Sequence, residues 1–531
     1  VYRQILDPVA HSLAWSSLAA ALPLALLFVM LGVLRVRAWI ASVVSLGIAI
    51  GIAVAVYEMP IGQAVLAGSE GAVFGFFPIL WIVINAIWVY QMTVQTGHFD
   101  VLRRSFATVS DDHRIQAVII AFSFGALLEA LAGFGTPVAV TSVMLLALGF
   151  KPLKAAALSL VANTAPVAFG AMATPIITLA KVSGLPTDIL GAMVGRQTPI
   201  LSVFVPLALV AIVDGRRGLR ETWPLALTGG MVFGIAQYAT SNFVSVPLAD
   251  VVASLLSALA VVLVVRIRRS HNDSGPAEGA AEASPRAEVV RAYAPYLIII
   301  VVFVICQIAA VKRLLDAVTC TVHWPGLHLL TAKGAVSSIP AFTFNLLTTP
   351  GTQMLAAGLV TMAVLRVSPA GAVKAYGATL YQLRWAIVTV MAVLALAFVM
   401  NASGQTITLG TWMAGAGGAF ALLSPILGWL GTAVTGSDTS ANSLFGALQV
   451  TAASKAGLSP VLMAAGNSSG GVLGKMISPQ NLAIGAAAVG LHGREGDLFR
   501  RVVAWSVVFL VLVCLLSGLQ ASVLSWMVPG A

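Results

Sequence analysis

Asparagine and hydroxyl side chains interrupt two long apolar stretches of this sequence. Asn163 and Thr164 begin the run NTAPVAFGAMATP, and Asn467 and Ser468 begin the run NSSGGVLGKMISP. Polar groups inside a membrane are costly to bury, and they usually mark a binding site or an ion pathway. Amide and hydroxyl groups can hydrogen-bond a carboxylate ligand. We therefore predict that these four residues bind a substrate.

Three charged residues lie within or beside the same apolar stretches. Glu129 and Asp438 are candidates for proton coupling, because burial disfavours the ionised form of a carboxyl group. For each of them, a permanently paired structural carboxylate is the alternative. Lys475 lies in the second run and has two interpretations. It either binds the carboxylate of a substrate or pairs with Asp438.

Two short breaks in the apolar pattern lie upstream of the two runs. Gly135 and Thr136 lie in the first break, GFGTP, and Ser437, Thr439 and Ser440 lie in the second, GSDTSANS. A helix that begins at such a break has free backbone N–H groups and a partial positive charge, which suit a carboxylate. Hydroxyl groups and unwound carbonyl groups would alternatively hold Na⁺. We predict that all five residues bind substrate.

The composition places these motifs in a membrane. Of the 531 residues, 59% are hydrophobic and 9% are charged, and the mean hydropathy is +0.97. Apolar runs of about 18 residues or more recur along the chain, and each is long enough to cross a bilayer core about 30 Å thick. These features predict an all-α polytopic membrane protein. The net charge of +10 is spread over short loops, so it indicates membrane topology and no nucleic-acid partner.

The positive charges also predict an orientation. Arg and Lys gather in alternate loops, which the positive-inside rule places in the cytoplasm and which leaves both termini outside. The first apolar run (13–34) is then a retained helix, and the segment 115–150 must enter and leave on one side. Two full spans need about 40 residues plus a turn, so we predict a re-entrant hairpin there, with two short spans as the alternative. The predicted fold has about twelve transmembrane helices plus two re-entrant hairpins.

An internal repeat relates the two halves of the chain. With a shift of 304 residues, NTAPVAFGAMATP falls on NSSGGVLGKMISP, and Thr136 falls on Ser440. The first copy begins inside and the second outside, and inverted repeats with paired broken helices are typical of secondary transporters. The predicted parts are an N-terminal half (1–265) with a hairpin (about 115–150) and a broken helix (about 155–180), a disordered cytoplasmic linker (266–291), and a C-terminal half (292–531) with a second hairpin (about 419–454) and a second broken helix (about 457–489).

Several longer motifs resemble the bacterial lactate permease family. They are LLEALAGFGTPVAVT, GFKPLKAAALSLVANTAPVAFGAM, MVGRQTP, GSDTSANSLFGALQ and GKMISPQNLAIGAAAVG. The resemblance extends from residues 7–8 to 519–527 and is weakest in the linker and near 312–345. It implies a proton symporter of the cytoplasmic membrane that takes up lactate and often glycolate. Thr136 stands where the family motif has Ala, and GNSSGG stands where ANTTGG is more usual, which leaves the preferred 2-hydroxy acid open.

The residues and the resemblance together predict a transport mechanism. A small 2-hydroxy monocarboxylate binds between the two breaks and the two Asn-containing runs, a proton accompanies it, and access alternates between the two sides. A Na⁺-coupled carboxylate transporter is the main alternative, and a channel or membrane sensor is another. The sequence has no ATPase motif GxxxxGK[ST], no local nucleophile–base pair and no metal-binding cysteine spacing. We therefore expect no enzymatic activity, no cofactor and no metal site.

Overall fold

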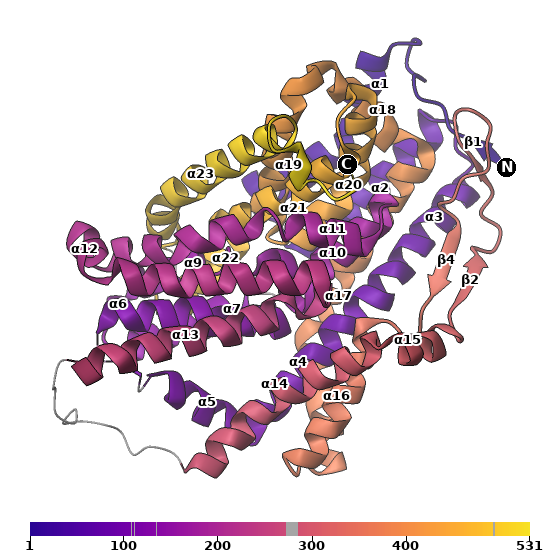
Figure 1. Ribbon diagram of the computed structural model, residues 1–531. Helices are drawn as coiled ribbons and strands as arrows, with labels where there is room; N and C mark the ends of the chain where they lie inside the picture. Colours follow the sequence, from indigo (N-terminus) through magenta and orange to yellow (C-terminus); the bar gives the residue numbers. More distant parts are fainter. Residues whose placement is uncertain (108, 111, 134, 272–284, 492–493, 531) are drawn as a thin grey trace.

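Helices make up most of the computed structural model, which describes the chain except residues 108, 111, 134, 272–284, 492–493 and 531 (Figure 1). This agrees with the prediction, because a chain inside a membrane must satisfy its backbone hydrogen bonds internally. The helices before residue 272 are α1 (Leu13–Phe28), α2 (Ala38–Ala55), α3 (Ile61–Phe74), α4 (Trp81–Gln95), α5 (His98–Ala107), α6 (His113–Gln116), α7 (Gly125–Ala132), α8 (Thr136–Ala147), α9 (Pro152–Ala162), α10 (Gly170–Ser183), α11 (Thr187–Val194), α12 (Thr198–Phe243) and α13 (Ala249–His271). Tighter or wider helical turns join some of them at Val29–Val33, Gly75–Leu80, Ala117–Phe124, Val167–Phe169 and Val246–Leu248.

The second half is also mainly helical and contains most of the β structure. Its helices are α14 (Arg286–Gln307), α15 (Ala309–Asp316), α16 (Pro350–Val364), α17 (Pro369–Ser403), α18 (Gln405–Met413), α19 (Phe420–Thr435), α20 (Asp438–Ala456), α21 (Pro460–Gly474), α22 (Pro479–Ala488) and α23 (Glu495–Gln520). Tight helical turns lie at Ala414–Ala419, Lys475–Ile477 and Ser525–Met527. The strands of the whole chain are β1 (Tyr2–Arg3), β2 (Cys320–His323), β3 (Leu329–Leu330) and β4 (Ala341–Phe344).

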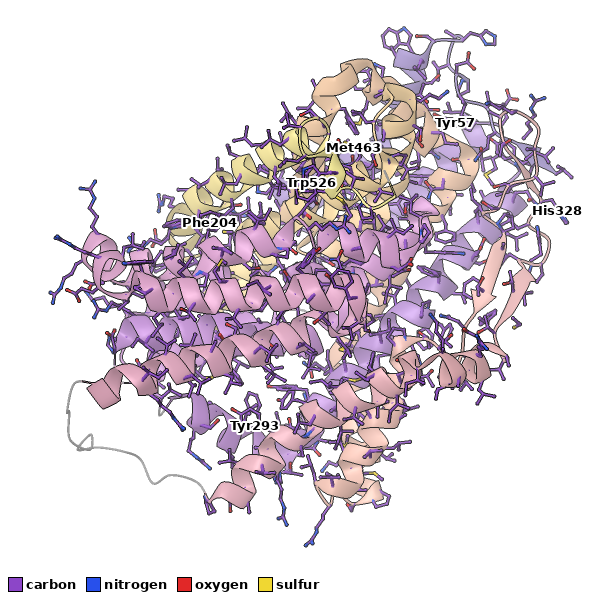
Figure 2. The ribbon with its side chains drawn as sticks, in the orientation of Figure 1. Tyr57, Phe204, Tyr293, His328, Met463 and Trp526 are labelled. Atoms are coloured by element: carbon purple, nitrogen blue, oxygen red, sulfur yellow. The ribbon has the colours of Figure 1, made fainter. Side chains whose placement is uncertain are left out.

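The four short strands depart from the prediction of an entirely helical protein. β1 pairs with β3 in parallel, and β2 pairs with β4 in an antiparallel hairpin. The Tyr2 hydroxyl donates hydrogen bonds to the carbonyl oxygens of Tyr57 and Ser403, each at 2.9 Å. Figure 2 shows Tyr57 and His328 at the end of the molecule that carries these strands. The sheets lie outside the apolar segments, where strand edges can meet water, so hydropathy alone did not reveal them.

The described residues contain ten helices that are long and apolar enough to cross a membrane, or up to eleven if a bent pair is counted. The bent pair is Pro152–Ala162 with Val167–Ser183, which turns by 65°. A multi-pass membrane fold is therefore confirmed. The count of twelve spans and the re-entrance of the hairpins stay predictions. Of the predicted linker 266–291, residues 272–284 lie outside the described residues.

Contacts between loops sort the loops into two ends of the molecule. At one end, the Tyr2 hydroxyl of β1 donates to the Ser403 carbonyl oxygen. The Arg196 guanidinium donates to the Asn242 side-chain oxygen and to the Met527 carbonyl oxygen. At the other end, Arg114 forms an ion pair with Glu221, and the Lys154 ammonium donates to the Val213 carbonyl. The second end carries the loops that the positive-inside rule places in the cytoplasm. We call it the arginine-rich end.

Both breaks form helical hairpins. In the first, Gly125 of α7 faces Thr141 of α8, where an added Cβ would lie 3.4 Å from the Thr141 methyl group. In the second, Gly431 of α19 faces Ala441 of α20 in the same way, at 3.0 Å. The turns need glycine, since Gly133, Gly135 and Gly436 all have positive φ angles. A helix, a short break and an antiparallel return helix therefore occur in both halves.

The two broken helices differ in where they break. The first break falls at Asn163, where α9 ends, and α10 then opens with positive φ angles at Ala171, Met172 and Ala173. The second break falls at residues 475–478, between α21 and α22. Asn467 and Ser468 lie inside the continuous helix α21, so the prediction of a break beside them is wrong. Pro479 begins α22, which is the position where proline suits a helix.

Glycine allows α19 and α21 to pack at backbone contact distance. A Cβ added at Gly470 would overlap the carbonyl oxygen of Pro425, and one added at Gly428 would overlap the carbonyl oxygen of Asn467. Small residues of this kind let membrane helices approach closely and gain van der Waals contact. This packing fixes the position of α21 relative to the second hairpin.

We expect the variant Gly470→Ala to be less stable than the wild type. The added methyl group must push α19 and α21 apart, and overpacking of this kind typically costs about 1–3 kcal/mol. Thermal unfolding of the purified protein in detergent should show a lower melting temperature. Gly47→Ala is the control, because nothing lies within 4 Å of a Cβ added there. Equal melting temperatures for the two variants would contradict the close packing.

Candidate functional site

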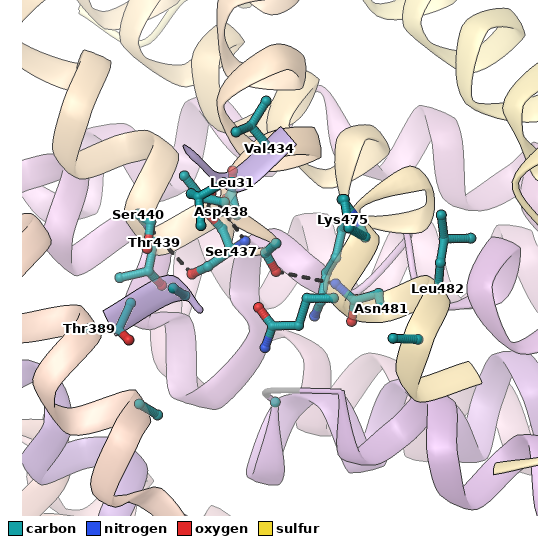
Figure 3. Close-up of a pocket in the computed structure, with 18 of the residues that line it drawn as sticks. Leu31, Thr389, Val434, Ser437, Asp438, Thr439, Ser440, Lys475, Asn481 and Leu482 are labelled. Carbon is teal, nitrogen blue, oxygen red and sulfur yellow. Dashed lines mark hydrogen bonds between the residues drawn. The ribbon is translucent and has the colours of Figure 1, made fainter. Parts of the chain in front are cut away.

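A cavity of about 1340 Å³ lies where the two hairpins and the two broken helices meet. Figure 3 shows Ser437, Asp438, Thr439 and Ser440 on one side of the cavity and Lys475 with Asn481 on the other. The first half contributes Glu129, Gly133 and the start of α10 to the walls. The exposed lining residues, among them Arg35, Arg37, Arg384 and Phe499, belong to the arginine-rich end. The cavity is therefore open at that end.

A buried ion pair joins the two halves of the chain in the cavity wall. The Lys475 ammonium donates a hydrogen bond to Glu129 Oε1 at 2.6 Å. The Lys475 side chain is 7% exposed and the Glu129 side chain is 4% exposed. The Asn163 amide donates to the other carboxylate oxygen, Oε2, at 2.9 Å. The predicted pairing of Lys475 with Asp438 is therefore wrong, since its ion-pair partner is the carboxylate of the opposite half.

Two glycines and a left-handed turn make room for the Glu129 carboxylate. A Cβ added at Gly170 would lie only 2.7 Å from Glu129 Oε1. At Gly133, with a φ angle of +45°, a Cβ would lie 3.4 Å from the Ala171 Cβ. Ala171, Met172 and Ala173 adopt positive φ angles, which cost energy for residues with a Cβ. This arrangement brings the start of α10 against the first hairpin tip.

Asp438 is held at the start of α20 by neutral donors. The Ser468 hydroxyl donates to Asp438 Oδ2 at 2.6 Å, and the Asn442 amide donates to the same oxygen at 3.3 Å. Asp438 is 2% exposed, and it forms no ion pair with any residue that the structure describes. A Cβ at Gly471 would overlap Asp438 Oδ1, so glycine is required for the carboxylate to approach α21.

Asn442 is the centre of a polar network behind Asp438. Its amide group also donates to the Pro175 carbonyl and to the Ser468 hydroxyl, both at 3.1 Å. Its carbonyl oxygen accepts a hydrogen bond from the Asn467 amide at 2.9 Å. Gln449 in turn donates to the Asn467 carbonyl oxygen at 3.0 Å. The network connects α20, α21 and α10, so it links the repeat copies through hydrogen bonds.

Comparison with known proteins identifies the family of this chain. The family pattern described as L-lactate permease matches residues 16–524. The chain belongs to the L-lactate permease family. It is 41% identical to an L-lactate permease of Escherichia coli K12 over the whole of both chains, and 39% identical to that of Bacillus subtilis over 99% of this chain and 100% of the relative. It is also 40% identical to the glycolate permease GlcA of Escherichia coli K12, over 97% of each chain. Together with its apolar helices, membership makes it a multi-pass membrane transport protein.

Four of the predicted binding residues line the cavity of this permease beside Asp438. They are Ser437, Thr439, Ser440 and Lys475. The Ser437 hydroxyl accepts a hydrogen bond from the Ser440 backbone N–H at 3.3 Å, which caps α20. Asn481 completes this region, because its amide donates to the Gly436 carbonyl at 3.2 Å. The second hairpin tip is therefore preorganised.

The other predicted binding residues lie behind the cavity wall. Gly135 packs against Ile484 of α22. The Thr164 hydroxyl donates a hydrogen bond to the Val161 carbonyl oxygen at 2.7 Å. Residues Thr136, Asn163, Asn467 and Ser468 also lie away from the lining of the cavity. Two of these four support charged residues, since Asn163 donates to Glu129 and Ser468 donates to Asp438. The role of these residues as direct ligands of a substrate stays a prediction. The observed contacts of Asn163 and Ser468 are with the two carboxylates.

Sequence reasoning missed several residues of the site. Asn442 and Asn481 belong to motifs that were recognised, GSDTSANSLFGALQ and GKMISPQNLAIGAAAVG, but were not chosen. Thr174 also lines the cavity and was not chosen. Asn442 follows Asp438 by four residues, a spacing that places two side chains on one helix face. That spacing could have identified Asn442.

We expect Lys475→Met to destabilise the permease. The substitution leaves the Glu129 carboxylate buried without its cation, and breaking a buried ion pair typically costs about 3–5 kcal/mol. The double variant Glu129→Gln/Lys475→Met removes both charges and should recover most of the melting temperature in detergent. Lys374→Met is the control, because Lys374 is exposed on α17. A double variant that melts no higher than Lys475→Met alone would contradict the pairing.

Proposed function

We propose that this permease takes up a small 2-hydroxy monocarboxylate, such as lactate or glycolate, together with a proton. The names of its relatives support the substrate class, since they are L-lactate and glycolate permeases. The chemistry of the cavity supports it as well. A buried ammonium group suits a carboxylate, and hydroxyl groups at a helix start suit the 2-hydroxyl and a second carboxylate oxygen.

The observation that carries the proposal is the buried ion pair between Lys475 and Glu129, 2.6 Å apart, in the wall of the cavity. A substrate carboxylate that binds Lys475 competes with Glu129 for the same ammonium group. With both carboxylates ionised, the buried site would carry an uncompensated negative charge, which is costly. A proton on Glu129 removes that charge. Substrate and proton are therefore bound together.

Asp438 is the second candidate for the proton. It is buried, its partners on Oδ2 are a hydroxyl and an amide, and its Oδ1 has no hydrogen-bond partner among the described residues. An ionised carboxylate offers about four acceptor positions, so this environment satisfies it incompletely. It lies on the cavity wall beside Ser437 and Thr439, which supports its assignment to the proposed substrate region. Variants of the two carboxylates distinguish the candidates.

Alternating access follows in this proposal from the repeat and from the open end of the cavity. The cavity opens at the arginine-rich end, which the positive-inside rule places in the cytoplasm, with both termini outside. The structure then corresponds to the inward-open state. Movement of the hairpin and broken-helix units relative to the other helices would close this end and open the opposite one, as inverted-repeat transporters do.

Uptake by proteoliposomes should follow the pH gradient. With one proton per substrate, a gradient of about one pH unit, acidic outside, is worth about 1.4 kcal/mol and supports about tenfold accumulation. Labelled lactate and glycolate should accumulate to this ratio in Na⁺-free buffer. Vesicles without protein are the control. Uptake that requires Na⁺ and does not respond to the pH gradient would contradict proton coupling and favour the Na⁺-coupled alternative.

Glu129→Gln should separate exchange from accumulation. Glutamine keeps the shape and the hydrogen bond to Lys475 but cannot take up or release a proton. We expect exchange of internal for external lactate to continue, whereas accumulation under the same pH gradient falls to a ratio of about one. Asp438→Asn is the matched variant. If it alone loses accumulation, Asp438 carries the proton, and full accumulation in both variants excludes both residues.

A further inference from the structure

A third buried carboxyl group lies outside the cavity. Asp250 stands in the first turn of α13 and is 0% exposed. Its Oδ1 accepts one hydrogen bond, from the Gln237 amide at 2.7 Å. Its Oδ2 is buried and has no hydrogen-bond partner among the described residues. An ionised carboxylate has about four acceptor positions, of which this environment fills one.

Gln237 connects Asp250 to the first broken helix. The same Gln237 amide nitrogen lies 3.4 Å from the carbonyl oxygen of Ala165, in the break between α9 and α10. The Thr198 hydroxyl donates to the Gln237 carbonyl oxygen at 3.1 Å, which fixes the amide orientation. Asn163, two residues before Ala165, donates to Glu129. The short segment 163–165 is therefore joined to Glu129 directly and to Asp250 through Gln237.

No cation balances Asp250 among the described residues. The helix α7 contributes Glu129, whose negative charge acts on Asp250. The charged residues of α12 lie at 214–221 and those of α14 lie near the linker, both remote from the start of α13. The segment Ala117–Phe124 carries no charge, and the only charged residue of α10 is Lys181, near its far end. Asp250 therefore has a like-charged neighbour in Glu129 of α7 and no compensating cation among the described residues.

We infer that Asp250 is a second proton-binding site of the transport cycle, coupled to Glu129 across the break at residues 163–169. The inference rests on the proposed proton coupling and extends it to a residue outside the substrate cavity. A proton on Asp250 removes the like charge near Glu129. Release of that proton restores a charged acceptor for the Gln237 amide. This strengthens its hydrogen bond to Asp250 relative to its contact with the Ala165 carbonyl oxygen in the break.

The pH dependence of lactate exchange tests the inference. With equal pH on both sides of proteoliposomes, exchange that requires a proton on each of two carboxyl groups gives a limiting slope of about two on the alkaline side of a log rate–pH plot. Asp250→Asn should reduce this slope to about one, while exchange continues at low pH. Asparagine retains the acceptor for Gln237, so the hydrogen bond is kept. Ser254→Ala, one turn further along α13, is the control and should keep the wild-type slope.

The possible outcomes separate this inference from the proposed function. A wild-type exchange rate that does not depend on pH, together with no pH-driven accumulation, overturns proton coupling itself. Proton-driven accumulation with an unchanged slope in Asp250→Asn overturns only the role of Asp250. If Asp250→Asn does not yield folded protein, Asp250→Ser, which is smaller and also neutral, should show the same reduced slope. A slope in Asp250→Ser equal to that of the wild type also overturns the inference.

Discussion

The cost of burying charge in a membrane protein is the constraint on which this site depends. Lys475 and Glu129 lie in opposite halves of the sequence, and burying either of them alone would be costly. Their pairing requires the second broken helix to meet the first hairpin tip. Gly133 and Gly170 leave the space for the Glu129 carboxylate, and Asn163 satisfies its other oxygen. The ion pair therefore acts as a structural link between the two halves of the chain. In the proposed mechanism, the same ammonium group also binds the carboxylate of the substrate.

The two halves of the chain share a similar local architecture but differ in the chemistry of their side chains. Each has a helical hairpin and a broken helix, but Glu129 precedes the first tip, whereas Asp438 follows the second. Lys475 stands where the first copy has Ala171, which takes part in a left-handed turn. One copy therefore supplies the cation and a carboxylate held by neutral donors, and the other supplies the partner of the cation. Two similar helical arrangements therefore contribute different side chains to the site.

Polar networks behind the cavity extend the site beyond the residues that a ligand can touch. Asn442 connects Asp438 to the carbonyl of Pro175 in the other copy, and Gln237 lies between Asp250 and the break at Ala165. Hydrogen bonds of this kind are strong in a low-dielectric interior and costly to leave unmade. Each network therefore connects a buried carboxyl group to a backbone carbonyl group of the first broken helix.

The sequence by itself determined the membrane class, the family and the two hairpin breaks, because apolar length and glycine at a turn are local signals. It also singled out Glu129, Asp438 and Lys475, which the structure places in the cavity wall, because a charge in an apolar run is a local signal as well. It also located Ser437, Thr439 and Ser440 at the cavity. Only the tertiary structure decided that Lys475 pairs with Glu129, that Asn467 lies in an unbroken helix and supports Asn442, and that short strands cap one end. The ion pair depends on segments that meet across 346 residues of chain, whereas Asn467 and Asn442 are 25 residues apart but lie on different helices. Such distant contacts are set by close packing at glycines and by charge compensation, and no local pattern encodes them.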